Sequence, residues 1–93
     1  MPRPRRQRRI SFEPDVTYFK PAGVRKSELE IVNLNLDELE ALRLKNLKNL
    51  DQEQAAKEMK ISQPTFHRLL LEARKKITDA LVNGKALKIE KNE

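Results

Sequence analysis

Residues 50–84 constrain the fold most, because they hold two helix signals with almost no chain between them. Asp51 is a good N-cap, and Gln54 three residues later completes a capping-box pattern. Ser62 is the N-cap of a second helix, and Asn83 and Gly84 form a left-handed stop signal. Two helices joined by so short a turn must cross steeply, which is the geometry of a helix-turn-helix.

Apolar residues in this stretch repeat at helical spacing. In the first helix, predicted from residue 51 to about 60, the apolar face consists of Ala55, Ala56 and Met59. In the second helix, predicted over 62–82, the stripe consists of Phe66, Leu69, Leu70, Ala73, Ile77, Ala80 and Leu81. Ile61 and Phe66 are spaced as a hydrophobic staple across the cap.

Polar residues at the start of the second helix are the candidate functional residues. In a helix-turn-helix this end of the second helix faces base edges in the major groove. The candidate base-contacting residues are Gln63, Thr65, His67 and Arg68. Glutamine pairs bidentately with adenine and arginine with guanine. The candidate phosphate-contacting residues are Lys60, Ser62, Arg74 and Lys75. The alternative is a plain helical hairpin in which these side chains form a solvated face.

The spacing of these residues resembles the helix-turn-helix of region four of bacterial sigma factors. The positions that match are Gln54, Ala56, Ile61, Ser62, Thr65, Arg68 and Leu70, with Phe66 where valine is usual. Lys60 stands where that motif usually has glycine. The lysine must therefore adopt a positive φ, or the turn must differ.

Residues 1–9 form a basic arm with two prolines and no acid, and its candidate phosphate contacts are Arg3, Arg5, Arg6, Arg8 and Arg9. The net charge is +6, so the rest of the chain carries only +1. We expect the arm to be disordered alone and to lie along phosphates or in a minor groove. A solubility tail or an arm for an acidic protein is the alternative.

Residues 10–33 are expected to be extended, since Pro14 and Pro21 exclude a helix interior. Phe12, Tyr18 and Phe19 favour a strand, and we expect them to pack on the helical core. Stacking on single-stranded nucleic acid is the alternative. Residues 28–33 fit neither the helical nor the strand period.

Residues 34–50 contain the clearest helix start, where Asn35 caps, Glu38 closes the capping box and Leu34 staples to Leu39. Its predicted apolar stripe consists of Leu36, Leu39, Leu42 and Leu47, widened by Leu44. We expect this helix to support the helix-turn-helix and close a three-helix core. Residues 85–93 are expected to be a short strand or tail, with a strand pairing with residues 10–12.

The expected fold class is therefore mainly α. A three-helix helix-turn-helix domain, similar to sigma region four, is predicted over 34–84. The basic arm at 1–9, the extended aromatic segment at 10–33 and the short strand or tail at 85–93 flank it.

Several functional classes are disfavoured by what the chain contains. With no cysteine, one histidine and two glycines, we expect no disulfide, no metal site, no cofactor and no enzyme activity. No apolar run is long enough to cross a membrane, and the arginine-rich start lacks the apolar stretch of a signal peptide. We expect a cytoplasmic, nucleoid-associated protein.

Beyond the helix-turn-helix, the chain resembles over nearly its whole length a small prokaryotic family of inferred DNA-binding proteins. The most specific shared run is Val16, Thr17, Tyr18, Phe19, Lys20 and Pro21. Residues 36–44 and 79–86 also match. The resemblance implies a cytoplasmic DNA-binding protein. Some relatives carry a cysteine where this chain has Gln7, so a metal or redox role in them does not carry over.

The leading hypothesis is a sequence-specific regulator that binds double-stranded DNA as a homodimer on two half-sites. The alternatives are a protein-interaction module that docks on RNA polymerase or another partner, and an RNA-binding protein that uses the arm and the aromatics. Replacing Gln63 and Arg68 separates these hypotheses, because only the first predicts a loss at particular bases.

Overall fold

A computed structural model describes residues 10–91 of the chain. The five arginines predicted to contact phosphate from the arm lie outside these residues. The helices and strands follow in the order β1 (Tyr18–Phe19), a 3₁₀ turn (Lys26–Glu28), β2 (Ile31–Asn35), α1 (Leu36–Leu42), a π-helical turn (Arg43–Leu47), α2 (Gln52–Met59), α3 (Gln63–Asn83) and β3 (Ala86–Glu90). Helical residues are the majority of the described chain, which confirms the mainly helical prediction.

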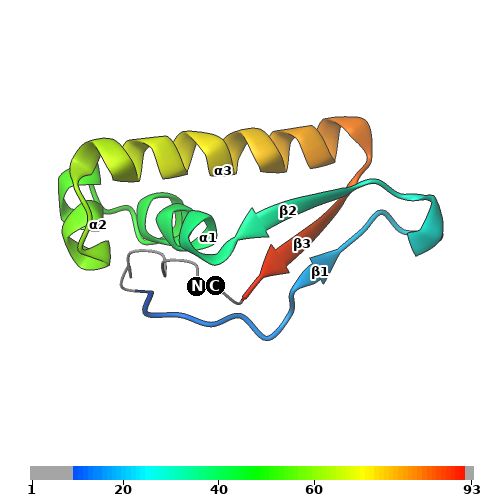
Figure 1. Ribbon diagram of the computed structural model, residues 1–93, viewed down its shortest axis with the longest axis horizontal. Helices are drawn as coiled ribbons and strands as arrows, with labels where there is room; N and C mark the ends of the chain where they lie inside the picture. Colours follow the sequence, from blue (N-terminus) through cyan, green and yellow to red (C-terminus); the bar gives the residue numbers. More distant parts are fainter. Residues whose placement is uncertain (1–9, 92–93) are drawn as a thin grey trace, which may run out of the picture.

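The long helix α3 lies along one side of the molecule, with α1 and the sheet side by side beneath it (Figure 1). Its start matches the predicted cap, since the Ser62 hydroxyl accepts a hydrogen bond from the Thr65 backbone N–H at 3.2 Å. Its end also matches, because Gly84 has a φ of +65° and terminates the helix in the left-handed conformation. The helix boundaries read from the caps are therefore confirmed within one residue.

The shorter helix α2 begins at the predicted cap, where the Asp51 carboxylate accepts a hydrogen bond from the Gln54 N–H at 2.8 Å. It ends at Lys60, which has a φ of +58° and a ψ of +44°. Of the two possibilities that the sequence left open, a lysine in the left-handed region is the one found. Only three residues, 60–62, separate α2 from α3.

Two adjoining apolar clusters form the core, and α3 contributes to both. The first lies between α1, α2 and the first half of α3, and its buried members are Ala41, Leu44, Ala55, Ala56, Met59, Phe66 and Leu70. Ile61 packs against it, as the predicted staple to Phe66 requires. The second lies between α3 and the sheet, and its buried members are Leu34, Ala73 and Ile89. Leu42 packs against both clusters and joins them.

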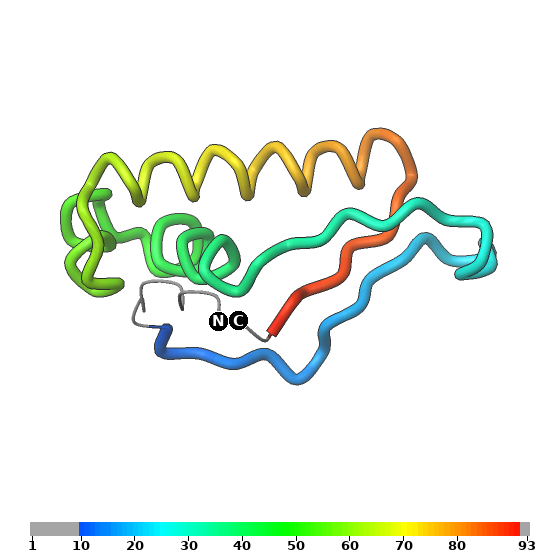
Figure 2. The backbone as a smooth tube through the Cα atoms, viewed as in Figure 1, coloured from blue at the N-terminus to red at the C-terminus, as the bar shows by residue number. Residues whose placement is uncertain are grey.

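The sheet has the strand order β1-β3-β2. β3 runs parallel to β2, with Ile31 opposite Ala86, and antiparallel to β1, with Tyr18 opposite Lys88. A parallel pair needs a crossover, and here all three helices lie between β2 and β3 in the chain (Figure 2). The sequence left residues 28–33 undecided, and the last three of them belong to β2. β2 runs directly into α1, because Asn35 is both the last residue of the strand and the cap of the helix.

The sheet itself differs from the sequence prediction. β3 exists as predicted, but its pairing with residues 10–12 was wrong, since its partners are β1 and β2. The backbone N–H of Ser11 instead donates to the Glu40 carboxylate on α1 at 3.2 Å. The chain reaches the sheet later, where the Thr17 carbonyl accepts a hydrogen bond from the Ile89 N–H at 2.8 Å.

Two leucines assigned to apolar stripes are not in the core: Leu47 and Leu81 are each 76 % exposed. Leu47 lies in the π-helical turn, which adds a residue to the turn and rotates the stripe out of register. Leu81 follows the buried Ala80 and is rotated by about 100° away from the buried face of α3.

The aromatic segment also departs from the prediction that it packs on the helical core. Phe19 is 51 % exposed, and the ring of Phe12 lies beneath the Arg43 guanidinium, 5.4 Å from its centroid. The Lys26 ammonium lies 4.7 Å from the centroid of Tyr18. Cations therefore lie over two of these rings, those of Phe12 and Tyr18.

Candidate nucleic-acid interface

The first turns of α3 carry exposed polar residues beside and opposite their buried face. Phe66 and Leu70 are fully buried against α1 and α2, while Gln63, His67 and Arg68 are exposed. At about 100° per residue, Arg68 points away from the core side on which Phe66 lies, while Gln63 and His67 lie about 60° and 100° round the helix from Phe66. Three of the four predicted base-contacting residues are therefore exposed around the start of α3.

Thr65, the fourth predicted residue, is placed differently. It is half-buried on the flank of α3, and its hydroxyl accepts hydrogen bonds from the Ser62 hydroxyl at 2.9 Å and from the Arg68 guanidinium at 3.3 Å. Its side chain thus already has partners within the protein. This geometry suits Thr65 to orienting Arg68 rather than to touching a ligand itself.

Two further contacts join α3 to the chain between α1 and α2. The Nδ1 atom of His67 lies 3.2 Å from the Oε1 atom of Gln52, at the start of α2. The Arg74 guanidinium donates to the Asn46 side-chain oxygen at 3.3 Å. Sequence reasoning missed Gln52 and Asn46, because neither belongs to a recognisable motif and only the folded chain brings them to α3.

Basic side chains extend this surface in both directions. Lys60 in the turn and Arg74 and Lys75 further along α3 are all exposed, as predicted for phosphate contacts. The Ser62 hydroxyl is occupied in part by the helix cap. The surface around the start of α3 is therefore polar and positively charged.

Acidic groups on α3 lie further along it. Asp79 accepts hydrogen bonds from Asn83 at 2.6 Å and from Lys85 at 3.1 Å. These hydrogen bonds hold the pKa of Asp79 below its usual value, and the Asp79 carboxylate in turn raises the pKa of Lys85. Lys85 also pairs with Glu30 at 3.3 Å, which ties the end of α3 to the chain before β2. We interpret this cluster as structural.

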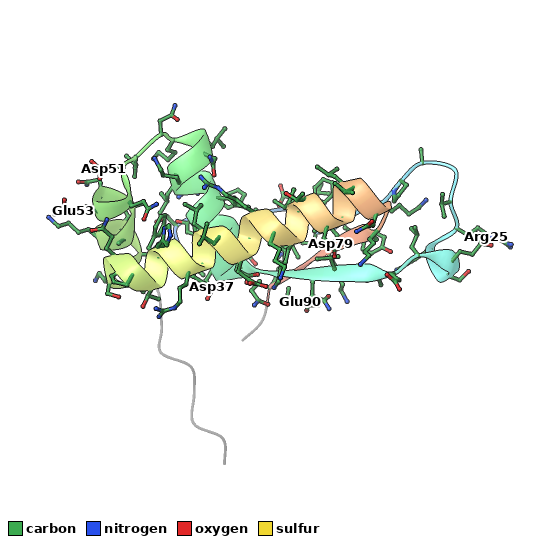
Figure 3. All side chains as sticks on the ribbon, turned by 90° about the horizontal axis from the view of Figure 1, so that it is seen from above. Arg25, Asp37, Asp51, Glu53, Asp79 and Glu90 are labelled. Atoms are coloured by element: carbon green, nitrogen blue, oxygen red, sulfur yellow. The ribbon has the colours of Figure 1, made fainter. Side chains whose placement is uncertain are left out.

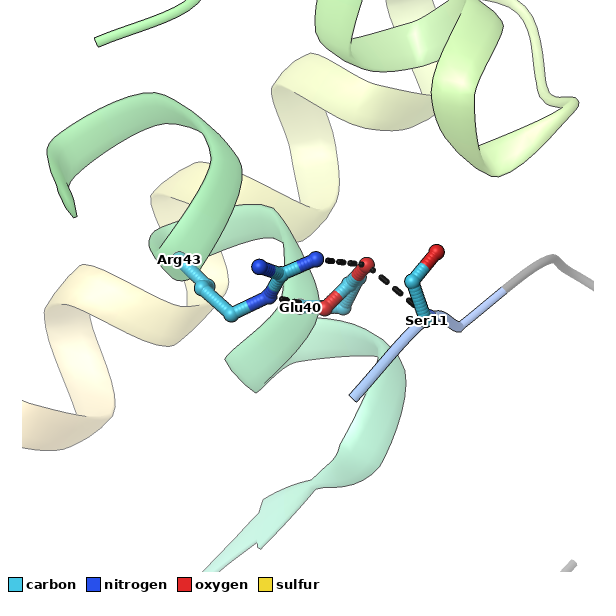
Figure 4. Close-up of polar contacts among 3 residues, drawn as sticks. All are labelled: Ser11, Glu40 and Arg43. Atoms are coloured by element: carbon cyan, nitrogen blue, oxygen red, sulfur yellow. Dashed lines mark hydrogen bonds and ion pairs between the residues drawn. The ribbon is translucent and has the colours of Figure 1, made fainter. Parts of the chain in front are cut away.

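A second polar cluster lies on α1, away from the start of α3 (Figure 4). Glu40 is almost fully buried and accepts hydrogen bonds from two Arg43 nitrogens, at 2.8 and 2.9 Å, and from the Ser11 N–H. The Glu40 carboxylate raises the pKa of Arg43, chiefly through these hydrogen bonds. Ser11 lies just beyond the basic arm in the chain, so this cluster holds the point from which the arm starts.

Residues 10–91 contain no group of three or more histidine, cysteine, aspartate or glutamate side chains arranged to hold a metal ion. Among the same residues, no helix is both long enough and apolar enough to span a membrane.

Comparison with protein families places this chain. The family described as "Protein of unknown function DUF134" matches residues 1–93. The chain belongs to the DUF134 family. A UPF0251 protein from Caldanaerobacter subterraneus subsp. tengcongensis is 57 % identical over 90 residues, covering 97 % of this chain and 76 % of the relative.

Two other relatives of this DUF134 chain are similarly close. A UPF0251 protein from Dehalococcoides mccartyi strain BAV1 is 59 % identical over 90 residues, covering 97 % of this chain and 77 % of the relative. A UPF0251 protein from Moorella thermoacetica is 57 % identical over 90 residues, covering 97 % of this chain and 60 % of the relative. No solved structure matches the chain.

Proposed function

We propose that this DUF134 chain is a sequence-specific, double-stranded DNA-binding protein that regulates transcription. In this proposal α2, the turn at 60–62 and α3 form a helix-turn-helix of the sigma region four type. The observation that carries it is the exposure of Gln63, His67 and Arg68 on the first two turns of α3, around the buried Phe66. That is the end of the second helix that a helix-turn-helix presents to base edges.

The proposed contacts follow from side-chain chemistry. Gln63 offers a donor and an acceptor to adenine, and Arg68 offers two parallel donors to guanine. His67 lies beside them, held by Gln52. We propose that Lys60, Ser62, Arg74 and Lys75 contact backbone phosphates, and that the arginines of residues 1–9 do so as well. No cofactor, metal ion or catalytic group enters this proposal.

We further propose that two copies bind together. One recognition helix touches few base pairs, and specific regulators of this size commonly bind two half-sites about 34–36 Å apart. Such a homodimer would act in the cytoplasm on chromosomal DNA. Its signature is a palindromic target sequence.

The experiment that tests the proposal is selection of binding sites from random duplex DNA. The affinities of the selected and a scrambled duplex are then compared at low and physiological salt. We expect the selected duplex to keep an advantage of about 10³-fold or more at physiological salt. If both duplexes bind alike and both are lost as salt rises, the proposal fails and only non-specific attraction remains.

A second experiment assigns the residues. Gln63→Ala and Arg68→Ala should each weaken binding by about 1–3 kcal/mol, and only where the duplex carries the base that the residue reads. Lys75→Ala is the matched control on the same helix, and it should weaken binding to all duplexes alike. Equal losses on every duplex for all three variants would contradict base reading by Gln63 and Arg68.

The competing candidate is a protein-docking module, with RNA polymerase as one partner. Leu81 and Val82 favour it, since these neighbouring apolar side chains near the end of α3 are 76 % and 74 % exposed. Leu81→Ser with Val82→Ser separates the two functions, because DNA binding by the start of α3 should be unchanged while docking should be lost.

A further inference from the structure

The chain between α1 and α2 runs beside the polar face of α3. Asn46, in the π-helical turn, meets Arg74 at 3.3 Å, and Gln52, at the start of α2, meets His67 at 3.2 Å. Along α3, His67 and Arg74 are seven residues apart, which is two turns or about 10.5 Å. Residues 46–52, hereafter the rim, are therefore held to the same flank of α3 at both ends.

Backbone hydrogen bonds also hold the rim to the start of the π-helical turn. The Lys48 N–H donates to the Arg43 carbonyl at 2.9 Å, and the Leu50 N–H donates to the Leu44 carbonyl at 3.0 Å. Asn49 between them has a φ of +62°, a conformation that asparagine tolerates. The rim is thus a shaped loop built on the core residue Leu44.

The rim carries one lysine and one aspartate, so an anion would meet its individual donors rather than a net positive charge. Lys48 is exposed and lies between the two contacts to α3. The single acid of the rim, Asp51, directs its carboxylate to the N–H of Gln54 as the cap of α2. Asn46 uses its side-chain oxygen to accept from Arg74, so its NH₂ group remains a donor.

The opposite flank of α3 is different in charge. Glu72 is exposed, and Asp79 lies seven residues or about two turns further along, on the same flank. Figure 3 looks down on α3 and shows Asp51, at the rim, and Asp79 on opposite sides of the helix. Arg68 and Lys75 also lie on the flank of Glu72 and Asp79, so acidic and basic side chains are mixed there, whereas Arg74 is on the flank beside the rim.

Groove dimensions connect the rim to DNA. An α-helix with its side chains is about 10–12 Å wide, and the major groove of B-DNA is about 12 Å wide. A helix that lies in the groove fills it, so a loop beside the helix meets the phosphates that form the groove wall.

We propose that the rim is a second DNA-contacting element that binds the phosphate backbone of one strand beside α3. Lys48 supplies the ionic contact and Asn46 an N–H donor, while Arg74 keeps Asn46 in place. This inference rests on the proposed DNA-binding function, and it adds residues that belong to neither helix of the helix-turn-helix.

The test compares Lys48→Gln with Lys88→Gln in the full chain, on the selected duplex and on a scrambled duplex. Both variants replace an exposed lysine and change the net charge equally, but Lys88 lies on β3 in the sheet. We expect Lys48→Gln to reduce the slope of log affinity against log salt by about 0.9 on both duplexes. We expect Lys88→Gln to keep the slope of the original chain.

A second pair of variants adds a negative charge instead. Asn46→Asp should weaken binding to both duplexes, whereas Asn33→Asp, at an exposed position of β2, should not. If Lys48→Gln and Asn46→Asp behave like their controls while the original chain still selects its sequence, the rim inference is overturned alone. If the original chain shows no preference for the selected duplex, the proposed function fails first.

Discussion

Glu40 and Arg43 form a bidentate ion pair within one stretch of helix, with N–O distances of 2.8 and 2.9 Å. The Glu40 side chain is 1 % exposed and that of Arg43 is 19 % exposed. Glu40 also accepts a hydrogen bond from the Ser11 N–H, and the Arg43 guanidinium lies over the Phe12 ring. This ion pair therefore attaches the segment that follows the basic arm to α1.

Removing one partner of this pair should destabilise the protein. Arg43→Ala removes two of the three hydrogen-bond donors to the buried Glu40 carboxylate and leaves only the Ser11 N–H. We expect the free energy of unfolding to fall by about 3 kcal/mol. The double variant Glu40→Leu with Arg43→Met should lose less, because no buried charge remains unpaired. Urea unfolding of Glu40→Leu, of Arg43→Met and of the double variant measures the coupling, and strictly additive losses would contradict it.

Lys60 should be a site where glycine stabilises the fold. An L-residue in the left-handed region costs about 1–2 kcal/mol, and glycine avoids that cost while losing about 0.5–1 kcal/mol of chain entropy. Lys60→Gly should therefore raise the free energy of unfolding by up to about 1.5 kcal/mol. Asn49→Gly is the matched comparison at φ +62°, where we expect almost no gain because asparagine already tolerates this region. Destabilisation by Lys60→Gly in urea would refute this account of the turn.

Thr65 should affect DNA recognition through Arg68. Thr65→Val keeps the shape of the side chain but removes the acceptor that lies 3.3 Å from the Arg68 guanidinium. We expect the preference for the base read by Arg68 to fall, by less than in Arg68→Ala. Affinities for duplexes that differ at single base pairs measure this, and combining the two substitutions should add nothing. A further loss in the double variant would show that Thr65 contacts DNA independently.

The Asp79 cluster should make stability depend on pH at the acidic end. Hydrogen bonds from Asn83 and Lys85 lower the pKa of Asp79 in the folded state, so its contribution is present above about pH 4, the ordinary range of aspartate. That contribution disappears as pH falls through the lowered pKa of the folded state. The pKa of Lys85 is raised in the folded state, so its contribution to stability is lost as the pH rises above about 10.

Asp79→Asn tests this dependence. The original chain should be the more stable at pH 7, and the difference in urea midpoint should shrink between about pH 4 and pH 2. Asn83→Ala keeps the carboxyl group but removes one of its hydrogen-bond donors, so it should show a smaller difference at pH 7. A constant difference between the original chain and Asp79→Asn across this range would contradict the assigned cause.

Local signals along the chain were sufficient to predict the helices. Caps act within three or four residues, so Asp51, Ser62 and Gly84 marked the ends of α2 and α3 without reference to the rest of the fold. The alternation of buried Phe66 with exposed Arg68 likewise follows from helical periodicity, which is why most of the candidate interface was visible in the sequence.

The sheet required the tertiary structure. β2 and β3 are separated by all three helices, and no local pattern specifies which distant segment will pair with Ala86–Glu90. Residues 10–12 and 18–19 both favour a strand, and only the folded chain shows that 18–19 pairs with β3 while Ser11 donates to Glu40 on α1. Pairing over such separations is decided by the packing of the whole chain.

The sequence by itself determined where α2 and α3 begin and end and that Gln63, His67 and Arg68 of α3 are exposed, because these properties depend on neighbours in the chain. Only the tertiary structure placed Asn46 against Arg74 and Gln52 against His67, and it alone decided that Leu47 and Leu81 stay outside the core. These relationships depend on how α1, its π-helical turn and α3 pack. That packing joins residues far apart in sequence, and no periodicity records it.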